Sequence, residues 1–121
     1  MSIQNVLVVD DMPMIVDKIK SIISELGIHV VTATTGKEAL VKAKYDPPDL
    51  IFMDVMMPEM DGFAACRKLR SEAETKNIPV VFVSSRDQAS DKMWARMQGA
   101  EAYVTKPFSR QDIIEQVNAF Q

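Results

Sequence analysis

Short, almost uninterrupted apolar runs alternate along the chain with segments of helical spacing, and this alternation restricts the possible folds more than any other feature. Five runs rich in Val, Ile and Phe predict strands covered on both faces: residues 6–9, 30–33, 50–53, 80–83 and 102–104. The intervening segments carry apolar residues three and four positions apart, as amphipathic helices do. Five strands, each followed by a helix, predict a three-layer α/β sandwich with a parallel sheet between two layers of helices.

The predicted helices have recognisable ends. The clearest apolar stripe runs from Ile15 to Leu26 and ends at Gly27, which suits the turn after a helix. A third helix opens at Asp61 and Gly62, and a fourth closes at Gly99. Asp46-Pro47-Pro48-Asp49 is the strongest loop signal.

Length and composition restrict the class of protein. The 121 residues are 47% hydrophobic and 26% charged, which is the usage of one globular domain. We therefore expect a single domain over residues 1–121, with no output domain. A formal charge of −3 argues against binding nucleic acid through the overall field. The chain has no apolar run near the roughly 20 residues of a membrane span and no visible signal peptide, so we expect a cytoplasmic protein without membrane insertion.

Polar side chains follow four of the predicted strands. Ligands of open parallel sheets bind beyond the carboxyl ends of the strands, so these residues are the candidates for a site. They are Asp10 and Asp11, Asp54, Ser84 and Ser85, and Thr105, Lys106 and Pro107. Each has an ordinary alternative, such as Asp10 or Asp11 capping the first helix. Because all of them would meet at one edge of one sheet, we expect them to act together.

The clustered acids predict a cation. Like charges within about 4–6 Å disfavour ionisation, so the three carboxylates need a counter-charge, which Lys106 and a divalent metal can supply. Ligands that are all oxygen favour Mg²⁺, with Mn²⁺ possible. A phosphoryl group would complete such a site, with Asp54 as the nucleophile, Asp10 and Asp11 holding the metal, and Ser84 donating its hydroxyl.

Four motifs carry a family resemblance over nearly the whole chain. They are Val-Val-Asp-Asp at 8–11, Asp-Val-Met-Met-Pro-Glu-Met-Asp-Gly at 54–62, Val-Ser-Ser at 83–85 and Tyr-Val-Thr-Lys-Pro-Phe at 103–108. The chain resembles the receiver domain of two-component response regulators, the CheY-like fold. This resemblance implies a flavodoxin-like sheet of strand order 2-1-3-4-5. It also implies a signalling protein, not an enzyme, which receives its phosphoryl group from a histidine kinase or a phosphotransfer domain and loses it by slow autodephosphorylation.

The resemblance also implies a role for each site residue. Asp54 matches the phosphoacceptor, and the implied Mg²⁺ ligands are Asp11, Asp54 and the backbone carbonyl of Met56, with Asp10 acting through water. Ser84 and Tyr103 match the switch pair, Lys106 matches the essential lysine with a cis bond to Pro107, and Ser85 and Arg86 lie in the loop at the site. Phosphorylation would bias the packing of the fourth helix, fifth strand and fifth helix, the face that contacts a downstream motor or regulatory protein. The implied state is a monomer or a weak phosphorylation-dependent dimer.

Residues 85–100 resemble the PilH-type regulators of twitching motility, which serve chemotaxis-like systems controlling type IV pili. A flagellar chemotaxis regulator or a receiver of another pathway remains open. A haloacid-dehalogenase-like phosphatase expects Asp-x-Asp after one strand, whereas Asp10 and Asp11 are adjacent here. A flavodoxin-like redox carrier expects a Ser/Thr/Gly phosphate loop after the first strand, and a pseudo-receiver would lack the intact set of Asp11, Asp54 and Lys106.

Four further residues carry expectations. We place Trp94 with Met93 and Met97 on a core stripe, although a projecting Trp94 would be a good partner anchor. The Met56 side chain could lie over the site and hinder attack of water on the acyl phosphate. Cys66 is expected to be buried and inert, and His29 to be structural, away from the reactive edge.

Overall fold

The computed structural model of the protein describes residues 2–121, in which five strands alternate with five helices. The strands are β1 (Asn5–Val9), β2 (His29–Ala33), β3 (Leu50–Met53), β4 (Val80–Ser84) and β5 (Ala102–Thr105). The helices are α1 (Pro13–Ser24), α2 (Gly36–Tyr45), α3 (Gly62–Ser71), α4 (Ala89–Met97) and α5 (Arg110–Ala119). The predicted alternation of strands and helices is confirmed.

All five strands are parallel and form one sheet in the order β2-β1-β3-β4-β5, as the family resemblance implied. β1 lies between β2 and β3, with Val6 opposite Val30 on one side and Leu50 on the other. The chain therefore reverses its direction of winding after β2, which places the carboxyl ends of β1 and β3 side by side. In doubly wound sheets this switch point is where ligands bind.

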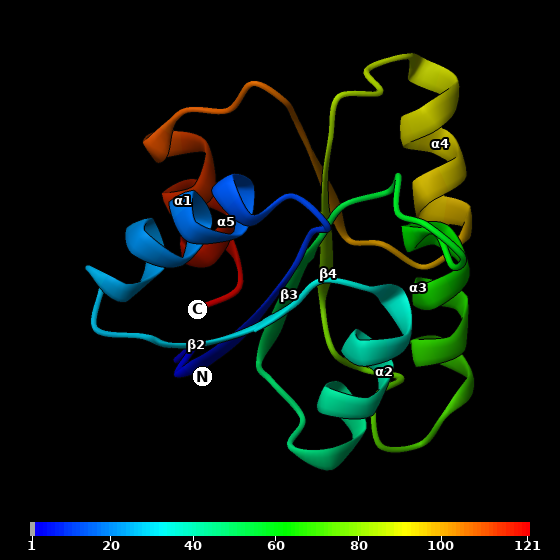
Figure 1. Ribbon diagram of the computed structural model, residues 1–121, viewed down its shortest axis with the longest axis horizontal. Helices are drawn as coiled ribbons and strands as arrows, with labels where there is room; N and C mark the ends of the chain where they lie inside the picture. The colour runs from blue at the N-terminus through cyan, green and yellow to red at the C-terminus, as the bar shows by residue number, and fades with distance from the viewer. Residues whose placement is uncertain (1) are drawn as a thin grey trace.

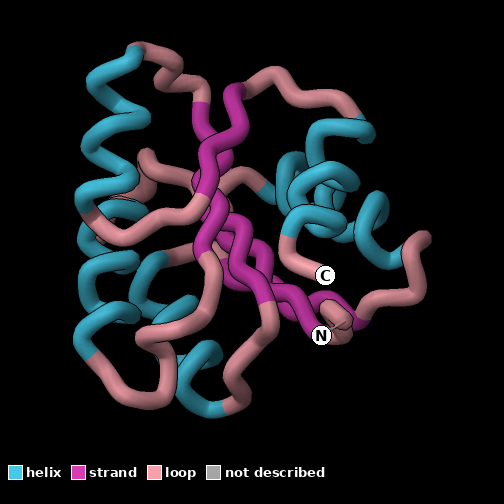
Figure 2. The backbone as a smooth tube through the Cα atoms, turned by 180° about the vertical axis from the view of Figure 1, so that it is seen from behind, coloured by secondary structure: helices cyan, strands magenta, loops and turns pink. Residues whose placement is uncertain are grey.

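Helices cover both faces of the sheet. Figure 1 shows α1 and α5 on one side and α2, α3 and α4 on the other, and Figure 2 shows the sheet between these two layers from behind. Successive residues of a strand point to opposite faces. Val6 and Val8 accordingly pack into the core beneath α1 and α5, whereas Leu7 and Val9 pack into the core beneath the other three helices. These two cores explain why the strand sequences read as continuous apolar runs.

Side-chain caps fix the start of three helices. Thr35, Asp61 and Ser109 accept a hydrogen bond from the backbone N–H three residues later, at the starts of α2, α3 and α5. The predicted opening of α3 at Asp61 is thus confirmed. The alternative role of Asp10 or Asp11 as the cap of α1 is wrong, because the N-cap is Met12, which makes no side-chain capping bond.

The end of α1 differs from the prediction. Leu26 was expected on the buried stripe but is exposed, because α1 ends at Ser24 and a turn carries the chain away from the core. Gly27 lies in that turn with a φ of 78°, a left-handed conformation that glycine adopts without strain.

The predicted core stripe of α4 is wrong. Met93, Trp94 and Met97 are exposed by 65%, 46% and 68%. The buried side chains of this helix are Asp91 and Ala95. The small Ala95 lets α4 sit close to the sheet, and Trp94 beside it and the methionines two positions away on either side are turned outward.

No helix described within residues 2–121 combines the length and the apolar character that crossing a membrane requires.

Candidate functional site

Three carboxylates meet beyond the carboxyl ends of β1 and β3. The backbone N–H of Asp54 donates to the carbonyl of Val9 (2.9 Å), so strand pairing continues just past the end of β3 and holds Asp54 beside β1. One carboxylate oxygen each of Asp10, Asp11 and Asp54 lies within 4.8 Å of the others. Asp10 and Asp54 are buried, whereas Asp11 is exposed. The cluster therefore consists of two buried carboxylates and one that is open to solvent.

Lys106 provides the counter-charge from the far edge of the site. Its Nζ lies 2.9 Å from an oxygen of Asp10 and 3.6 Å from an oxygen of Asp54. The backbone N–H of Lys106 donates to the carbonyl of Ser84 (2.8 Å), which fixes the loop after β5 against β4. The Lys106–Pro107 peptide bond is cis. The lysine thus lies nearer to Asp10 than to Asp54.

The two oxygens of Asp10 already have donors from the protein. One accepts a hydrogen bond from the backbone N–H of Met12 (2.9 Å), and the other accepts from Lys106 Nζ (2.9 Å). The carboxylate is thereby fixed in orientation. Asp11 is not engaged in this way among the hydrogen bonds described, which leaves it freer to bind a solute at the open side.

The electrostatics of the site fall mainly on Asp54. Burial first, and the negative charge of Asp10 second, raise the pKa of its carboxyl to about 6. Lys106 opposes this rise, as do backbone hydrogen bonds from Met56 and Val55. One lysine therefore does not neutralise the cluster. A further cation is favoured there, and donors that are all oxygen fit Mg²⁺.

Arg86 links the residues of the expected switch. Ser84 is buried, and its Oγ accepts a hydrogen bond from the backbone N–H of Arg86 (3.2 Å). The Tyr103 hydroxyl donates to the carbonyl of the same arginine (2.6 Å), and burial raises the pKa of this hydroxyl. The Arg86 side chain pairs with Asp91 of α4 (2.9 Å). The sequence placed Arg86 in a loop and did not predict these contacts. The available signal was the capping box from Gln88 to Asp91, which marks the start of α4 and so places Asp91 close to Arg86.

Gly62 packs directly against the backbone of Asp54, the phosphoacceptor candidate, and this contact was not predicted from the sequence. Its backbone N–H donates to the carbonyl of Val55 (2.8 Å). A Cβ at this position would lie 2.2 Å from the backbone oxygen of Asp54 and 2.9 Å from the ring of Phe82. Only glycine allows this approach. The Asp-Gly pair that marked the start of α3 was the available signal.

The loop after Asp54 forms an open hollow beside the site. Met56, Pro58, Asp61 and Arg86 contribute to its lining, together with Val55 and Met57, and its volume is about 380 Å³. The Met56 side chain is 57% exposed. It therefore stands at the mouth of the site and is not part of the core. Ser85 is also exposed, directly after β4.

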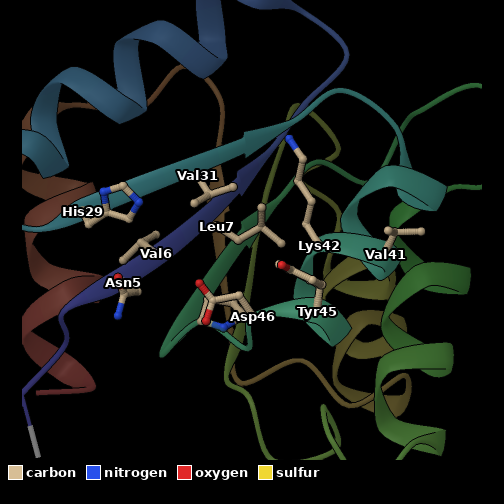
Figure 3. A pocket seen from close by; sticks show the side chains of 10 residues that line it. Asn5, Val6, Leu7, His29, Val31, Val41, Lys42, Tyr45 and Asp46 are labelled. Atoms are coloured by element: carbon tan, nitrogen blue, oxygen red, sulfur yellow. The ribbon is translucent and has the colours of Figure 1, made fainter.

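His29 and Cys66, which were expected to have no part in the site, lie away from the carboxyl edge of the sheet. His29 opens β2 at the other end of the sheet and lines a groove of about 270 Å³ with Val31 and Tyr45 (Figure 3). None of the three carboxylates lines that groove. Cys66 is buried in α3, and burial raises the pKa of its thiol to about 11, so the unreactive thiol form dominates at neutral pH.

A sequence profile of the response regulator receiver domain matches residues 6–118. The chain belongs to this family. Among curated proteins, the receiver is 38% identical over 114 residues to protein PilH of Pseudomonas aeruginosa, which covers 94% of each chain. It is 35% identical to protein PilG of the same organism, over 94% of this chain and 84% of PilG. Receivers are signalling proteins and not classical enzymes, so the phosphatase and redox-carrier alternatives are set aside.

Solved structures agree with the receiver fold. The chemotaxis protein CheY4 of Vibrio cholerae superposes with a TM-score of 0.93 at 28% identity, over 99% of this chain and all of that one. The receiver domain of the sensor histidine kinase PA1611 from Pseudomonas aeruginosa superposes with a TM-score of 0.89 at 25% identity, over 98% of both chains. That structure has a magnesium ion coordinated in its active site cleft.

Proposed function

We propose that this receiver accepts a phosphoryl group on Asp54 from a histidine kinase or a phosphotransfer domain. The observation that carries the proposal is the cluster of Asp10, Asp11 and Asp54 within 4.8 Å, with Lys106 Nζ 2.9 Å from Asp10 and 3.6 Å from Asp54. A buried carboxylate beside a fixed ammonium group is a nucleophile in a site that is prepared for negative charge.

The transfer needs one bond to break and one to form. An oxygen of Asp54 attacks the phosphorus, the bond from phosphorus to the donor histidine nitrogen breaks, and the released imidazole takes up a proton from solvent. Lys106 Nζ lies where it can offset charge on the phosphoryl oxygens. The Ser84 hydroxyl, buried next to this edge, donates to a phosphoryl oxygen after transfer. Slow attack of water on phosphorus breaks the bond from phosphorus to the Asp54 oxygen, releases inorganic phosphate and regenerates the Asp54 carboxylate.

The residues at the site fit Mg²⁺. Asp11, Asp54 and the backbone carbonyl of Met56 would hold it, and Asp10 would act through water because Met12 and Lys106 already occupy its oxygens. When bound, the ion supplies charge stabilisation to the phosphoryl group. The magnesium in the PA1611 receiver supports this assignment, and Mn²⁺ would meet the same oxygen donors.

We further propose that the receiver signals by protein contact through the α4–β5–α5 face to a downstream motor or regulatory protein. The similarity to PilH supports this, because the match covers 94% of PilH as well as 94% of this chain. It also supports a role in type IV pilus twitching motility, with flagellar chemotaxis as the alternative that the likeness to CheY4 keeps open.

Phosphorylation is tested by incubating the protein with Mg²⁺ and acetyl phosphate or phosphoramidate. Intact mass should show one added phosphoryl group that is stable to acid and labile to hydroxylamine. The adduct should be absent from Asp54→Ala and present in Asp17→Ala, a matched change of an exposed acid on α1. An Asp54→Ala protein that is modified with unchanged yield would refute the proposal.

The pathway is tested in Pseudomonas aeruginosa lacking pilH. Expression of this chain should restore the width of the twitching zone, and expression of Asp54→Ala at the same level should not. Restoration by both proteins would show that phosphorylation of Asp54 is not needed for the effect, and restoration by neither would contradict the twitching role.

A further inference from the structure

Helix α4 presents an apolar surface that the core does not use. Met93, Trp94 and Met97 are large, exposed and within two turns of each other, so they form one patch, here called the α4 patch. Isolated exposed apolar residues are ordinary, but a contiguous patch that contains the only tryptophan of the chain marks a surface for contact.

The α4 patch does not coincide with the flank of α4 that faces β5. Lys92 and Arg96 occupy that flank, because they line a hollow together with Tyr103 of β5. A helix turns about 100° per residue. Relative to the buried Ala95, this places Trp94 on the opposite flank.

The far flank of α4 faces α3. Gln98, just past the end of α4, accepts a hydrogen bond from Arg67 of α3 (2.8 Å). Both helices also contribute to the same core beneath the sheet, through Ala95 and Phe63. The α4 patch therefore extends from the outer surface of α4 toward α3 and is distinct from the α4–β5–α5 face.

The exposed charged side chains of α4 itself have one sign. The charged residues of α4 are Asp91, Lys92 and Arg96, and Asp91 is buried and paired with Arg86. The two exposed charged side chains of the helix are thus both basic. The exposed Arg67 of α3 adds a third positive charge near the carboxyl end of α4. A partner that covers the patch meets apolar side chains bordered by positive charge, which selects acidic residues on the partner.

Arg86 connects the α4 patch with the phosphorylation site. Its backbone contacts Ser84 and Tyr103, and its side chain pairs with Asp91 in the first turn of α4. Asp91 also accepts from the backbone N–H of Gln88 (3.2 Å), which closes the start of the helix. A shift of Ser84 toward a phosphoryl group therefore moves the residue to which the start of α4 is tied.

We propose that the α4 patch, Met93, Trp94 and Met97, binds an acidic amphipathic helix of a partner protein, and that the Arg86–Asp91 ion pair makes this binding respond to phosphorylation. The binding surface stands on the exposure and charge of α4 and the neighbouring Arg67, without reference to phosphorylation. The response to phosphorylation rests on the function proposed above for Asp54. The two parts can therefore fail separately.

Binding is tested with a designed helical peptide of about 16 residues, a length of about four turns, that has Leu and Phe on one face and Glu on the others. A twin with Lys in place of every Glu serves as its control. Because Trp94 is the only tryptophan, its fluorescence reports docking directly. We expect the acidic peptide to shift the emission of Trp94 to shorter wavelength and to bind at least about tenfold more tightly than its basic twin.

Variants locate the surface. The double change Met93→Gln and Met97→Gln should weaken peptide binding at least about tenfold, as loss of central apolar contacts does. Met14→Gln, which alters a still more exposed methionine on α1, should leave it unchanged. Thermal unfolding of each variant controls for loss of fold. Equal binding of both peptides, no binding of the acidic one below about 1 mM, or an unaffected double variant would overturn the assignment of the surface.

The link to phosphorylation is tested with the adduct on Asp54 verified by mass. Phosphorylation should change the affinity for the acidic peptide by at least about fivefold. In Asp91→Asn the adduct should still form but the affinity change should disappear. An affinity change that persists in this variant would overturn the role of the ion pair. A wild type that forms no adduct would instead refute the function proposed for Asp54 and leave the binding surface standing.

Discussion

The buried carboxylate of Asp54 concentrates the chemistry of this receiver in one side chain. Burial and the charge of Asp10 raise its pKa to about 6, although Lys106 Nζ lies 3.6 Å away. A group whose pKa is higher in the folded than in the unfolded state destabilises the fold once it is ionised. The ionised Asp54 carboxylate therefore lowers the stability of the fold. A bound cation, or replacement of the carboxylate by a neutral group, would relieve this cost.

Asp54→Asn should stabilise the metal-free protein at neutral pH. The folded carboxyl binds its proton up to about pH 6, whereas the unfolded one releases it near its ordinary pKa of 3.8. Stability from this group is thus present at low pH and lost as the pH rises between those values. Urea unfolding in EDTA should show the variant more stable by about 1–2 kcal/mol at pH 7 and equal to wild type near pH 4. A constant difference across this range would contradict the assigned cause, and Asp17→Asn serves as the control for an exposed acid.

Gly62→Ala should damage both stability and phosphorylation. The new Cβ would lie 2.2 Å from the backbone oxygen of Asp54, so the loop that carries the phosphoacceptor must move. We expect a loss of at least about 2 kcal/mol in urea unfolding and slower formation of the adduct. Gly27→Ala is the matched control: its Cβ meets nothing within 4 Å, but φ is 78°, so it should cost about 1 kcal/mol and leave phosphorylation unchanged.

Met56→Asn should shorten the lifetime of the phosphorylated form. The exposed methionine stands at the mouth of the site, where an amide would hold water that the thioether does not. Decay of the adduct, followed by mass after removal of the phosphodonor, should be several-fold faster than in wild type. The same decay rate in both proteins would show that Met56 does not shield the acyl phosphate. Met14→Asn controls for the loss of an exposed methionine elsewhere.

Among the elements, Arg70 of α3 joins three parts of the fold. Its Nε and Nη2 donate to the carbonyl of Gly99 after α4 (3.0 and 2.8 Å), and its Nη1 donates to the carbonyl of Ile78 before β4 (2.7 Å). It also pairs with Glu101, just before β5 (3.0 Å). The planar guanidinium reaches all of these acceptors at once, which a single ammonium group cannot do.

Arg70→Lys should therefore cost about 1–3 kcal/mol, since backbone carbonyls lose charged donors. Urea unfolding measures this loss, and hydrogen exchange should show it at the end of α4 before the rest of the sheet. Arg67→Lys is the matched control on the same helix, because within residues 2–121 the Arg67 side chain makes one hydrogen bond, to Gln98. Equal losses in both variants would contradict the special role of Arg70.

Helix α4 also shows what periodicity can and cannot predict. Its apolar residues have helical spacing, and the helix was placed correctly, but the stripe of Met93, Trp94 and Met97 does not face the sheet. Ala95 and Asp91 do, and Asp91 is tolerated there because Arg86 neutralises it. Spacing reports that one side of a helix is apolar. It does not report whether that side covers the core or awaits a partner.

For the molecule as a whole, the strand order brings distant segments to one metal site, so binding there should couple to global folding. Asp10 and Asp54 directly follow β1 and β3, and Lys106 lies in the loop after β5, so the unfolded chain does not hold them together. A ligand that binds only the folded state stabilises it in proportion to the logarithm of its concentration.

Mg²⁺ should raise the unfolding midpoint, by about 2.7 kcal/mol in free energy at one hundred times its dissociation constant. Thermal unfolding over a MgCl₂ series measures this, with NaCl of equal ionic strength as the control for screening. Asp54→Ala should lose most of the dependence. A midpoint that rises equally with both salts would show that no specific site binds Mg²⁺.

The sequence by itself determined the layers and the reactive edge. Runs buried on both faces require helices on both sides of a parallel sheet, and polar residues that directly follow such runs must lie at its carboxyl edge. Asp10, Asp54 and Lys106 were identifiable for that reason. Strand order was readable only through the family resemblance, because patterning records burial and not neighbours.

Only the tertiary structure decided which contacts connect these parts. The fit of Gly62 against Asp54, the tie from Arg86 to Asp91 and the outward face of α4 each depend on distances between segments that the pattern places independently. Hydrophobic periodicity is a property of one segment. The approach of two backbones, and the pairing of a loop arginine with a helix carboxylate, are set by how the packed layers meet.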